Sequence, residues 1–388
     1  MLLLAYFSYK LSIQNFAEFA IFWASLRMFC FYGNNNLHII YFNKVRKCLT
    51  KRKHWPIEIS SNITITLTLF CILTTIISFY LFNGLSTALV MVGCLICFII
   101  IRNISEFAKV DNNLFLSIFI DDILFYLLFF ILSIVSLNYS NDLNTVIYAL
   151  LIASVLTTIV GLLLFVKKFK IKIITYKISL KHFEINDFKL GLNYTFLRGN
   201  EVLSNFTVRY LGQIYFGDLF VAYSHIMYQF YNIFSLLTMS TISGFQSKIT
   251  VKITHKFTKE FINLAYKKIQ KTLLPFAILM LIMLSLFSNQ ILYWFFPKFV
   301  SYDILLLKVG FAGIAFTLIQ PLVFILVYNN KFINIKKLNF TQYFVMVMLF
   351  SLPYVFPNFN QHNWLLLVMV SFVLVQGLFA WLNYTKIK

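Results

Sequence analysis

The sequence has few acidic residues, few glycines and prolines, and none of the common enzyme motifs. In 388 residues, Asp and Glu number 13 against 33 Lys and Arg, with only 12 Gly and 6 Pro. There is no Gly-rich phosphate loop, no H-E-x-x-H and no G-x-S-x-G, and His182, His255 and His362 lie alone in polar segments. These absences predict that the chain is not an enzyme.

The five cysteines do not form a metal or redox motif either. Most lie in apolar stretches, and Cys94-x-x-Cys97 has no second ligand pair, no nearby His and no soluble redox domain around it. We therefore expect no metal and no cofactor.

What the chain does have is apolar sequence. It is 60% hydrophobic and 12% charged, with a mean hydropathy of +0.81, which is typical of a polytopic membrane protein. No polar stretch is long enough to fold as a separate domain. The net charge of +20 comes mainly from Lys between apolar runs, so it indicates membrane topology and not a nucleic-acid partner.

Apolar runs of spanning length predict an all-α fold. A shorter run, Leu2 to Tyr9, is expected to be the outer end of a first helix whose beginning is missing. The eleven full runs are 14–33, 62–83, 85–102, 114–138, 143–166, 190–214, 219–247, 272–296, 303–328, 340–356 and 363–384.

The loops alternate between basic and nearly uncharged, which by the positive-inside rule puts the C-terminus in the cytoplasm. Basic loops are predicted at 34–61, 103–113, 167–189, 248–271 and 329–339. The plan is twelve transmembrane helices: an N-terminal half at 1–166, a basic cytoplasmic linker at 167–189 and a C-terminal half at 190–388. Two six-helix halves are expected of a transporter with its site between them.

One predicted helix, within Lys189 to Asp218, carries a polar stripe. Ionised groups in hydrocarbon cost several kcal/mol each, so the stripe is expected to face a bundle interior or a wet cavity. An Arg198–Glu201 ion pair that only ties helices together is the alternative. The residues that share this side at helical spacing are Tyr194, Arg198, Glu201, Asn205, Arg209 and Gln213.

Arg27 and Arg198 each lie roughly 13–18 Å into a predicted span, near the midplane. Two guanidinium groups meeting there could bind a phosphate or pyrophosphate bidentately. Alternatively, Arg27 pairs with Glu18 or bonds a helix carbonyl.

Two weaker candidate groups lie in other spans. Tyr228 and Asn232 share a face of the next helix and could contact sugar rings and hydroxyls, although plain hydrogen bonding between helices explains them as well. Asp121 and Asp122 could hold a proton or Na⁺ for coupling, but a solvated helix start is the better interpretation.

Two stretches resemble a known superfamily. Gly217-Asp218-Leu219-Phe220-Val221-Ala222-Tyr223 looks like the turn between helices 7 and 8 of polysaccharide flippases. Asn15-Phe16-Ala17-Glu18-Phe19-Ala20, followed by Gly33-Asn34-Asn35, is similar to their helix 1–2 turn and the end of helix 2. The chain thus resembles Wzx-type O-antigen flippases of the multidrug/oligosaccharidyl-lipid/polysaccharide (MOP) flippase superfamily, through loose motifs and a MATE-like layout.

The resemblance implies a multi-pass carrier of the bacterial cytoplasmic (inner) membrane, acting in O-antigen, lipopolysaccharide or capsule biosynthesis. It would flip an undecaprenyl-pyrophosphate-linked oligosaccharide by alternating access, with membrane lipids, a polysaccharide polymerase and a chain-length regulator as further partners. Its short first helix suggests a start further upstream or a truncated copy. The substrate-binding residues it implies are Arg27, Arg198, Glu201, Asn205, Arg209, Tyr228 and Asn232.

Two other functions stay open at this point. A membrane glycan polymerase or ligase usually needs a large outer loop with catalytic Arg or His, and every predicted outer loop here is under about ten residues. A drug or metabolite exporter of the same superfamily would share the architecture, although a cationic stripe would repel organic cations.

Overall fold

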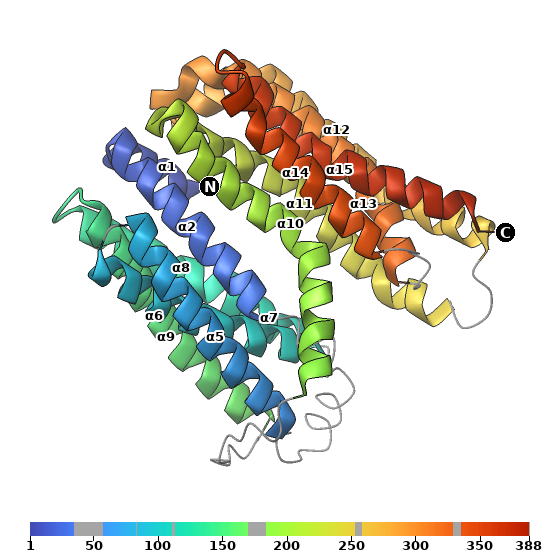
Figure 1. The fold of residues 1–388 in the computed structure, drawn as a ribbon, viewed down its shortest axis with the longest axis horizontal. Coiled ribbons are helices and arrows are strands. Elements are labelled where there is room, and N and C mark those ends of the chain that lie inside the picture. Colours follow the sequence, from blue (N-terminus) through green and yellow to red (C-terminus); the bar gives the residue numbers. More distant parts are fainter. Residues whose placement is uncertain are drawn as a thin grey trace. The chain divides into compact units, whose positions relative to one another are not determined.

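The computed structural model describes residues 1–34, 57–82, 84–110, 113–169, 184–252, 258–328 and 335–387, and every regular element in these ranges is a helix (Figure 1). All the predicted apolar runs fall on helices, and Leu2 to Tyr9 falls on α1. The longer elements are α2 (Ile13–Asn34), α5 (Ile57–Phe82), α6 (Leu85–Val110), α8 (Phe125–Leu137), α9 (Leu143–Phe169), α10 (Ile185–Phe216), α11 (Asp218–Lys252), α12 (Lys259–Phe295), α13 (Asp303–Tyr328), α14 (Ile335–Val355) and α15 (Gln361–Thr385). The shorter ones are α1 (Leu2–Lys10), α7 (Leu114–Ile118), the π-helix η1 (Phe119–Leu124) and the 3-10 helix η3 (Pro297–Tyr302).

Eight stretches of the described helices are long and apolar enough to cross a membrane. The more polar α2, α10 and α11 are not among them, so the count of twelve transmembrane helices stays a prediction. The eight are Ser61–Phe82, Leu85–Lys109, Phe115–Leu137, Leu143–Phe169, Lys259–Phe295, Pro297–Leu326, Lys337–Val355 and Gln361–Thr385.

Two predicted loops are largely helical instead. Most of 103–113 continues α6 to Val110, because Glu106 pairs with Arg102 and Lys109 at helical spacing. Within 248–271, α11 runs to Lys252 and α12 begins at Lys259. Residues 170–183 of the predicted linker, with His182, and also His255 lie outside the described ranges.

Several helix ends follow from local sequence. The side chains of Asn113, Thr258 and Asn360 accept backbone N–H bonds at the starts of α7, α12 and α15. Gly217 separates α10 from α11 at a φ of +82°, a conformation that glycine adopts without strain. The sequence motif that begins at Gly217 thus lies at a helix junction that its glycine explains.

The chain packs into two compact units, which we call unit 1 and unit 2. Unit 1 comprises Met1–Ala20 with Ser204–Lys388, and unit 2 comprises Ile21–Leu203. Both α2 and α10 therefore contribute residues to both units. The predicted boundaries at 166 and 190 stay a prediction.

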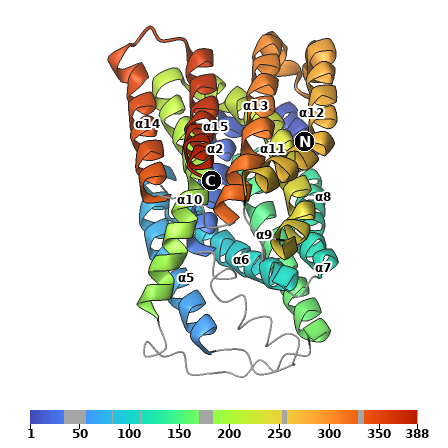
Figure 2. The ribbon, with the colours of Figure 1, turned by 90° about the vertical axis from the view of Figure 1, so that its right-hand side faces the viewer.

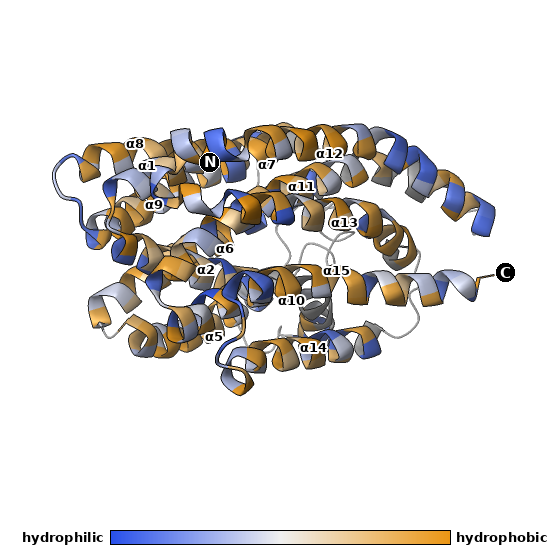
Figure 3. Ribbon diagram, turned by 90° about the horizontal axis from the view of Figure 1, so that it is seen from above, coloured by the Kyte–Doolittle hydropathy of each residue, from blue (hydrophilic) through white to orange (hydrophobic). Residues whose placement is uncertain are grey.

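In unit 2, α6 packs against α5 and α9, and α9 also packs against α8 (Figure 2). Its core includes a cluster from α6, α7, η1 and α9, built from Ile101, Ile104, Phe107, Ala108, Leu116, Ile120, Phe165 and Phe169. In unit 1, α13 is central and contacts α11, α12 and α15. Hydrophobic residues predominate along most of the helices in the ribbon coloured by hydropathy, as expected of helices in lipid (Figure 3).

Candidate functional site

Arg27 is an exposed charge on a buried stretch of α2. Every other residue in Ile21–Phe29 is buried. We expect an ionised guanidinium within a bundle of apolar helices to face water or a polar partner and not lipid. Glu18, the alternative partner considered for Arg27, accepts a hydrogen bond from Gln14 Nε2 at 3.1 Å.

In unit 2, α2 contacts α10 at the position next to Arg198. A Cβ added to Gly199 would lie 2.7 Å from Tyr32 Oη, so the end of the Tyr32 side chain reaches the α10 backbone there because residue 199 has no side chain. Tyr32 follows Arg27 by five residues, about 7.5 Å along the helix axis. The fold thus brings the backbone of Arg198 near the segment of α2 that carries Arg27. The side chains of Tyr194, Arg198 and Glu201 lie outside the described part of the chain.

A charged network lies beside this segment, where α6 meets η1. Arg102 binds Asp121 at 2.9 Å (Nη1 to Oδ2) and Glu106 at 2.8 Å (Nη2 to Oε1). Lys109 Nζ is 3.3 Å from the same Glu106 oxygen, and Ser105 Oγ donates to Asp121 Oδ2 at 3.3 Å. The π-helix places Asp121 in this network, so it has protein partners that a solvated helix start would not supply.

Asp122, the second carboxylate considered for ion coupling, is exposed. The charges of Lys109, Arg102 and Arg27 all lie near enough to interact with it. Arg27 therefore belongs to the same charged region of unit 2 as the α6 network. This region contains both signs of charge, and its geometry alone assigns no ion to Asp121 or Asp122.

In unit 1, Arg209 is buried and bonded. Its side chain is 1% exposed, Nη1 donates to the carbonyl oxygen of Ala20 at 3.1 Å, and its guanidinium carbon lies 5.7 Å from the ring centre of Tyr228. The structure thus brings together two of the predicted site residues, Arg209 and Tyr228. Their contact also ties α10 and α11 to the start of α2 within unit 1.

The remaining predicted residues of unit 1 are less enclosed. Asn205 and Asn232 are half-buried on α10 and α11. Gln213, at the end of the polar stripe, donates to Asp218 Oδ1 at 2.9 Å across the glycine junction. This bond gives Gln213 a role in fixing the turn between the two helices.

Lys298, which sequence reasoning did not single out, fixes the corner between α1 and α2. Its ammonium group donates to the carbonyl oxygens of Leu11 at 2.8 Å and Tyr9 at 3.2 Å. These carbonyls stand at the break between the two helices, where the helical hydrogen-bond pattern stops. In the sequence, the only signal for this role is that Lys298 follows Pro297 directly after an apolar run, which indicates a turn at the end of a helix.

Comparison with solved structures decides the fold. An inward-facing multidrug resistance MATE family transporter of the MOP superfamily aligns with a TM-score of 0.61 and 14% identity, covering 99% of this chain and 92% of that one. The MATE multidrug transporter DinF-BH, solved as a complex with a ligand, aligns with a TM-score of 0.59 and 17% identity, covering 100% and 92%. The chain has the MATE transporter fold.

An outward-facing MATE transporter also aligns, with a TM-score of 0.57 and 13% identity over 98% of this chain and 89% of that one. No family model matches the sequence, and no curated protein gives a significant match. The MATE fold confirms the predicted architecture at the level of the helical scaffold. At these identities it does not assign a substrate.

Proposed function

We propose that the chain is a multi-pass membrane transporter that moves a pyrophosphate-linked glycolipid, of the undecaprenyl-pyrophosphate oligosaccharide class, from one leaflet to the other by alternating access. The bacterial inner membrane is its proposed location. The MATE fold supports a transporter, and the eight apolar helices support a multi-pass membrane protein. The substrate is inferred from the cationic residues.

The observation that carries this proposal is the exposure of Arg27. It is the one exposed residue of Ile21–Phe29, and the Tyr32 side chain of the same helix contacts α10 at Gly199, next to residue 198. Two guanidinium groups from adjacent helices suit a pyrophosphate, since each can bind phosphate oxygens bidentately in a site of low dielectric. We propose that Arg27 and Arg198 bind the pyrophosphate.

The other predicted residues take different roles in this proposal. Arg209 is bonded inside unit 1, so it positions α10 and α11 instead of meeting the pyrophosphate directly. Tyr228 is 3% exposed and supports Arg209 through its ring face. Asn205, Asn232 and Glu201 remain predicted contacts for sugar hydroxyls.

A second candidate function is export of drugs or metabolites. The observation that favours it is the fold itself, because the aligned structures include multidrug transporters. Against it stands the exposed positive charge of Arg27, which repels cationic compounds.

The test is to delete the gene and follow both kinds of substrate, with ethidium as the cationic drug. Under the flippase proposal, complete single repeat units accumulate on the inner leaflet, surface polysaccharide disappears, and ethidium accumulation is unchanged. Under the exporter alternative, the glycan is normal and ethidium accumulates. If single units reach the surface but long chains do not, the protein is a polymerase and the proposal is wrong.

Complementation then tests Arg27 directly. Arg27→Ala should lower surface polysaccharide at least 10-fold at equal protein level, because a bidentate charged contact of about 1.5–3 kcal/mol is lost. Arg27→Lys should restore it only in part, since an ammonium keeps the charge without the bidentate geometry. Lys168→Ala, an exposed charge at the end of α9, is the matched control. Full activity of Arg27→Ala would remove this residue from the site.

A further inference from the structure

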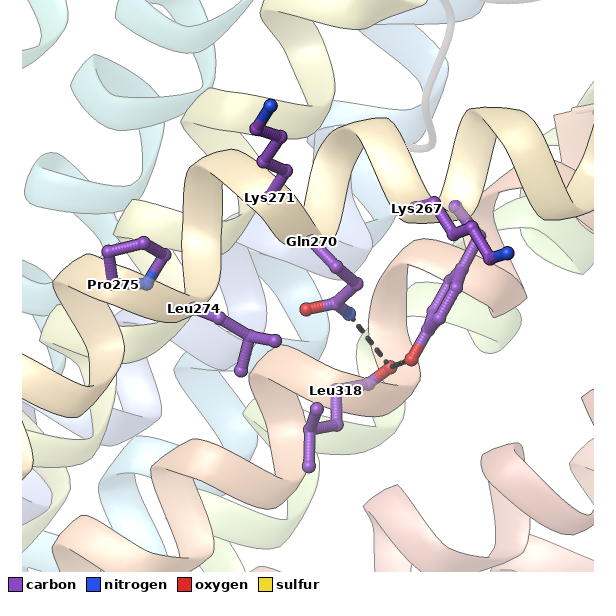
Figure 4. A pocket seen from close by; sticks show the side chains of 7 residues that line it. Lys267, Gln270, Lys271, Leu274, Pro275 and Leu318 are labelled. Carbon is purple, nitrogen blue, oxygen red and sulfur yellow. Dashed lines mark hydrogen bonds between the residues drawn. The ribbon is translucent and has the colours of Figure 1, made fainter.

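A groove in unit 1 lies between α12 and α13 and combines basic and apolar side chains. Its volume is about 460 Å³, and it is lined by Tyr266, Lys267, Gln270, Lys271, Leu274, Pro275 and Leu318. Figure 4 shows Gln270 between the two lysines on α12, with Leu318 on the facing helix. No acidic side chain is among the lining residues.

The groove has a fixed wall because of a proline. Pro321 lies inside α13 and has no N–H, so the carbonyl of Thr317, four residues earlier, lacks its helical partner. Gln270 Nε2 donates to both carbonyl oxygens, at 3.0 Å and 3.2 Å, and Tyr266 Oη donates to that of Leu318 at 3.0 Å. Polar bonds from α12 therefore hold α13 in place along one side.

The length of α12 places the groove at a membrane surface. With 37 residues the helix is about 55 Å long, well beyond the roughly 30 Å of a hydrocarbon core. Its apolar run from residue 272 to 295 fills the core by itself. Lys267 and Lys271 precede this run and are exposed, so they lie at the level of the lipid headgroups, while Leu274, Pro275 and Leu318 extend toward the acyl chains.

The basic end and the apolar end of the groove together match one class of molecule. Two lysines at spacing i, i+4 lie on the same face of a helix, close enough to contact one phosphate. Each basic residue near an anionic headgroup contributes on the order of 1 kcal/mol. The apolar end can take the first carbons of an acyl chain, and a free phosphate would leave it uncovered.

We propose that this groove binds an anionic phospholipid, with Lys267 and Lys271 on the phosphate and Leu274, Pro275 and Leu318 on the acyl chain. The site is separate from the residues proposed to bind the transported substrate. Its occupant is a lipid of the surrounding leaflet that contacts both Leu318 of α13 and the basic start of α12.

The test uses the purified full-length chain in detergent, with phosphatidylglycerol, phosphatidylcholine and soluble glycerol 3-phosphate as probes. Thermal unfolding and native mass spectrometry report stabilisation and bound lipid. Phosphatidylglycerol should raise the unfolding midpoint and remain bound, and the other two should do neither. The variant K267Q/K271Q should bind phosphatidylglycerol roughly 10- to 30-fold more weakly, given about 1 kcal/mol per lysine.

The matched control is K167Q/K168Q, which removes two exposed lysines from the end of α9 in unit 2. It should retain wild-type lipid binding. Equal losses in the two variants would mean general charge attraction and overturn the site. Stabilisation by glycerol 3-phosphate as strong as that by the lipid would show a soluble phosphate ligand and also overturn it. Because the readout is lipid binding, failure here leaves the glycan assays of the deletion strain unaffected.

Discussion

Arg102 on α6 and Asp121 on η1 form an ion pair with 2.9 Å between Nη1 and Oδ2. The residues are 19 positions apart, and Asp121 lies within the π-helix Phe119–Leu124. A π-helix inserts an extra residue into a turn and changes the direction of the side chains that follow, and such turns are frequent at functional sites. The pair thus fastens an irregular turn of one helix to a regular neighbour.

Breaking this pair should destabilise unit 2 only moderately. The Arg102 side chain is 43% exposed, so water screens part of the attraction, and Asp121→Ala is expected to cost about 1–2 kcal/mol. Unfolding of the purified protein, followed by circular dichroism in a double-mutant cycle with Arg102→Ala, measures the coupling between the two residues. Asp122→Ala, an exposed neighbour, is the matched control. A coupling energy near zero would show that the pair does not stabilise the turn.

The network also shows where sequence reasoning stopped short. The apolar run ends at Arg102, so the segment after it was predicted to be a loop. Glu106 lies four residues after Arg102, and Lys109 lies three residues after Glu106. These are the spacings of ion pairs along a helix, and they favour a continuation of α6 beyond the apolar run. The partner Asp121 could not be found in this way, because pairing across 19 residues depends on tertiary packing and on a π-helix that no local pattern predicts.

The arginines within predicted spans show a second limit of sequence reasoning. Helical spacing correctly placed Tyr228 and the stripe residues on helices, and apolar runs located the helices themselves. Spacing cannot distinguish a buried arginine from an accessible one, since this depends on the helices packed around it. The structure buries Arg209 against Ala20 and Tyr228 and exposes Arg27, although both arginines lie in the interior of long helices.

We therefore expect Arg209→Ala to lower the free energy of unfolding, and to reduce transport only through this loss of stability. It leaves the Ala20 carbonyl without its charged donor and opens a cavity at a side chain that is 1% exposed, so we expect a loss of about 2–4 kcal/mol. Thermal unfolding of the purified protein measures it. Ile214→Ala, at an exposed position of the same helix, serves as a control that should change stability little. Normal stability with lost transport would instead place Arg209 at the substrate.

Gly313 lies where α13 meets α11 in unit 1. A Cβ at this position would overlap the ring of Phe234 and lie 3.0 Å from its Cβ, an atom that cannot move without the α11 backbone. Gly313→Ala should therefore cost about 1–3 kcal/mol through overpacking, despite the better helix propensity of alanine. At Gly84 the nearest atom is 3.6 Å away, so Gly84→Ala should be nearly neutral. Equal unfolding midpoints for the two variants would contradict the close packing.

The bonds from Gln270 to α13 should depend on Pro321. In the wild type, Gln270→Leu removes a donor from each of the carbonyls of Thr317 and Leu318. Leu318 keeps its bond from Tyr266 Oη, whereas the buried Thr317 carbonyl is left unpaired, which costs about 1–3 kcal/mol. Pro321→Ala restores an N–H that can donate to the Thr317 carbonyl within the helix. In that background, the loss on Gln270→Leu should fall to less than half.

A four-variant cycle separates this coupling from plain packing. The free energy of unfolding is measured for the wild type, both single variants and the double variant under the same detergent conditions. Thr272→Ala, at an exposed position two residues further along α12, controls for a change in helix propensity. If Gln270→Leu costs the same in the wild type and in the Pro321→Ala background, the side chain stabilises α12 and α13 by contact alone and the carbonyls do not need it. A smaller cost in the Pro321→Ala background means that the proline of one helix creates the need for the glutamine of the other.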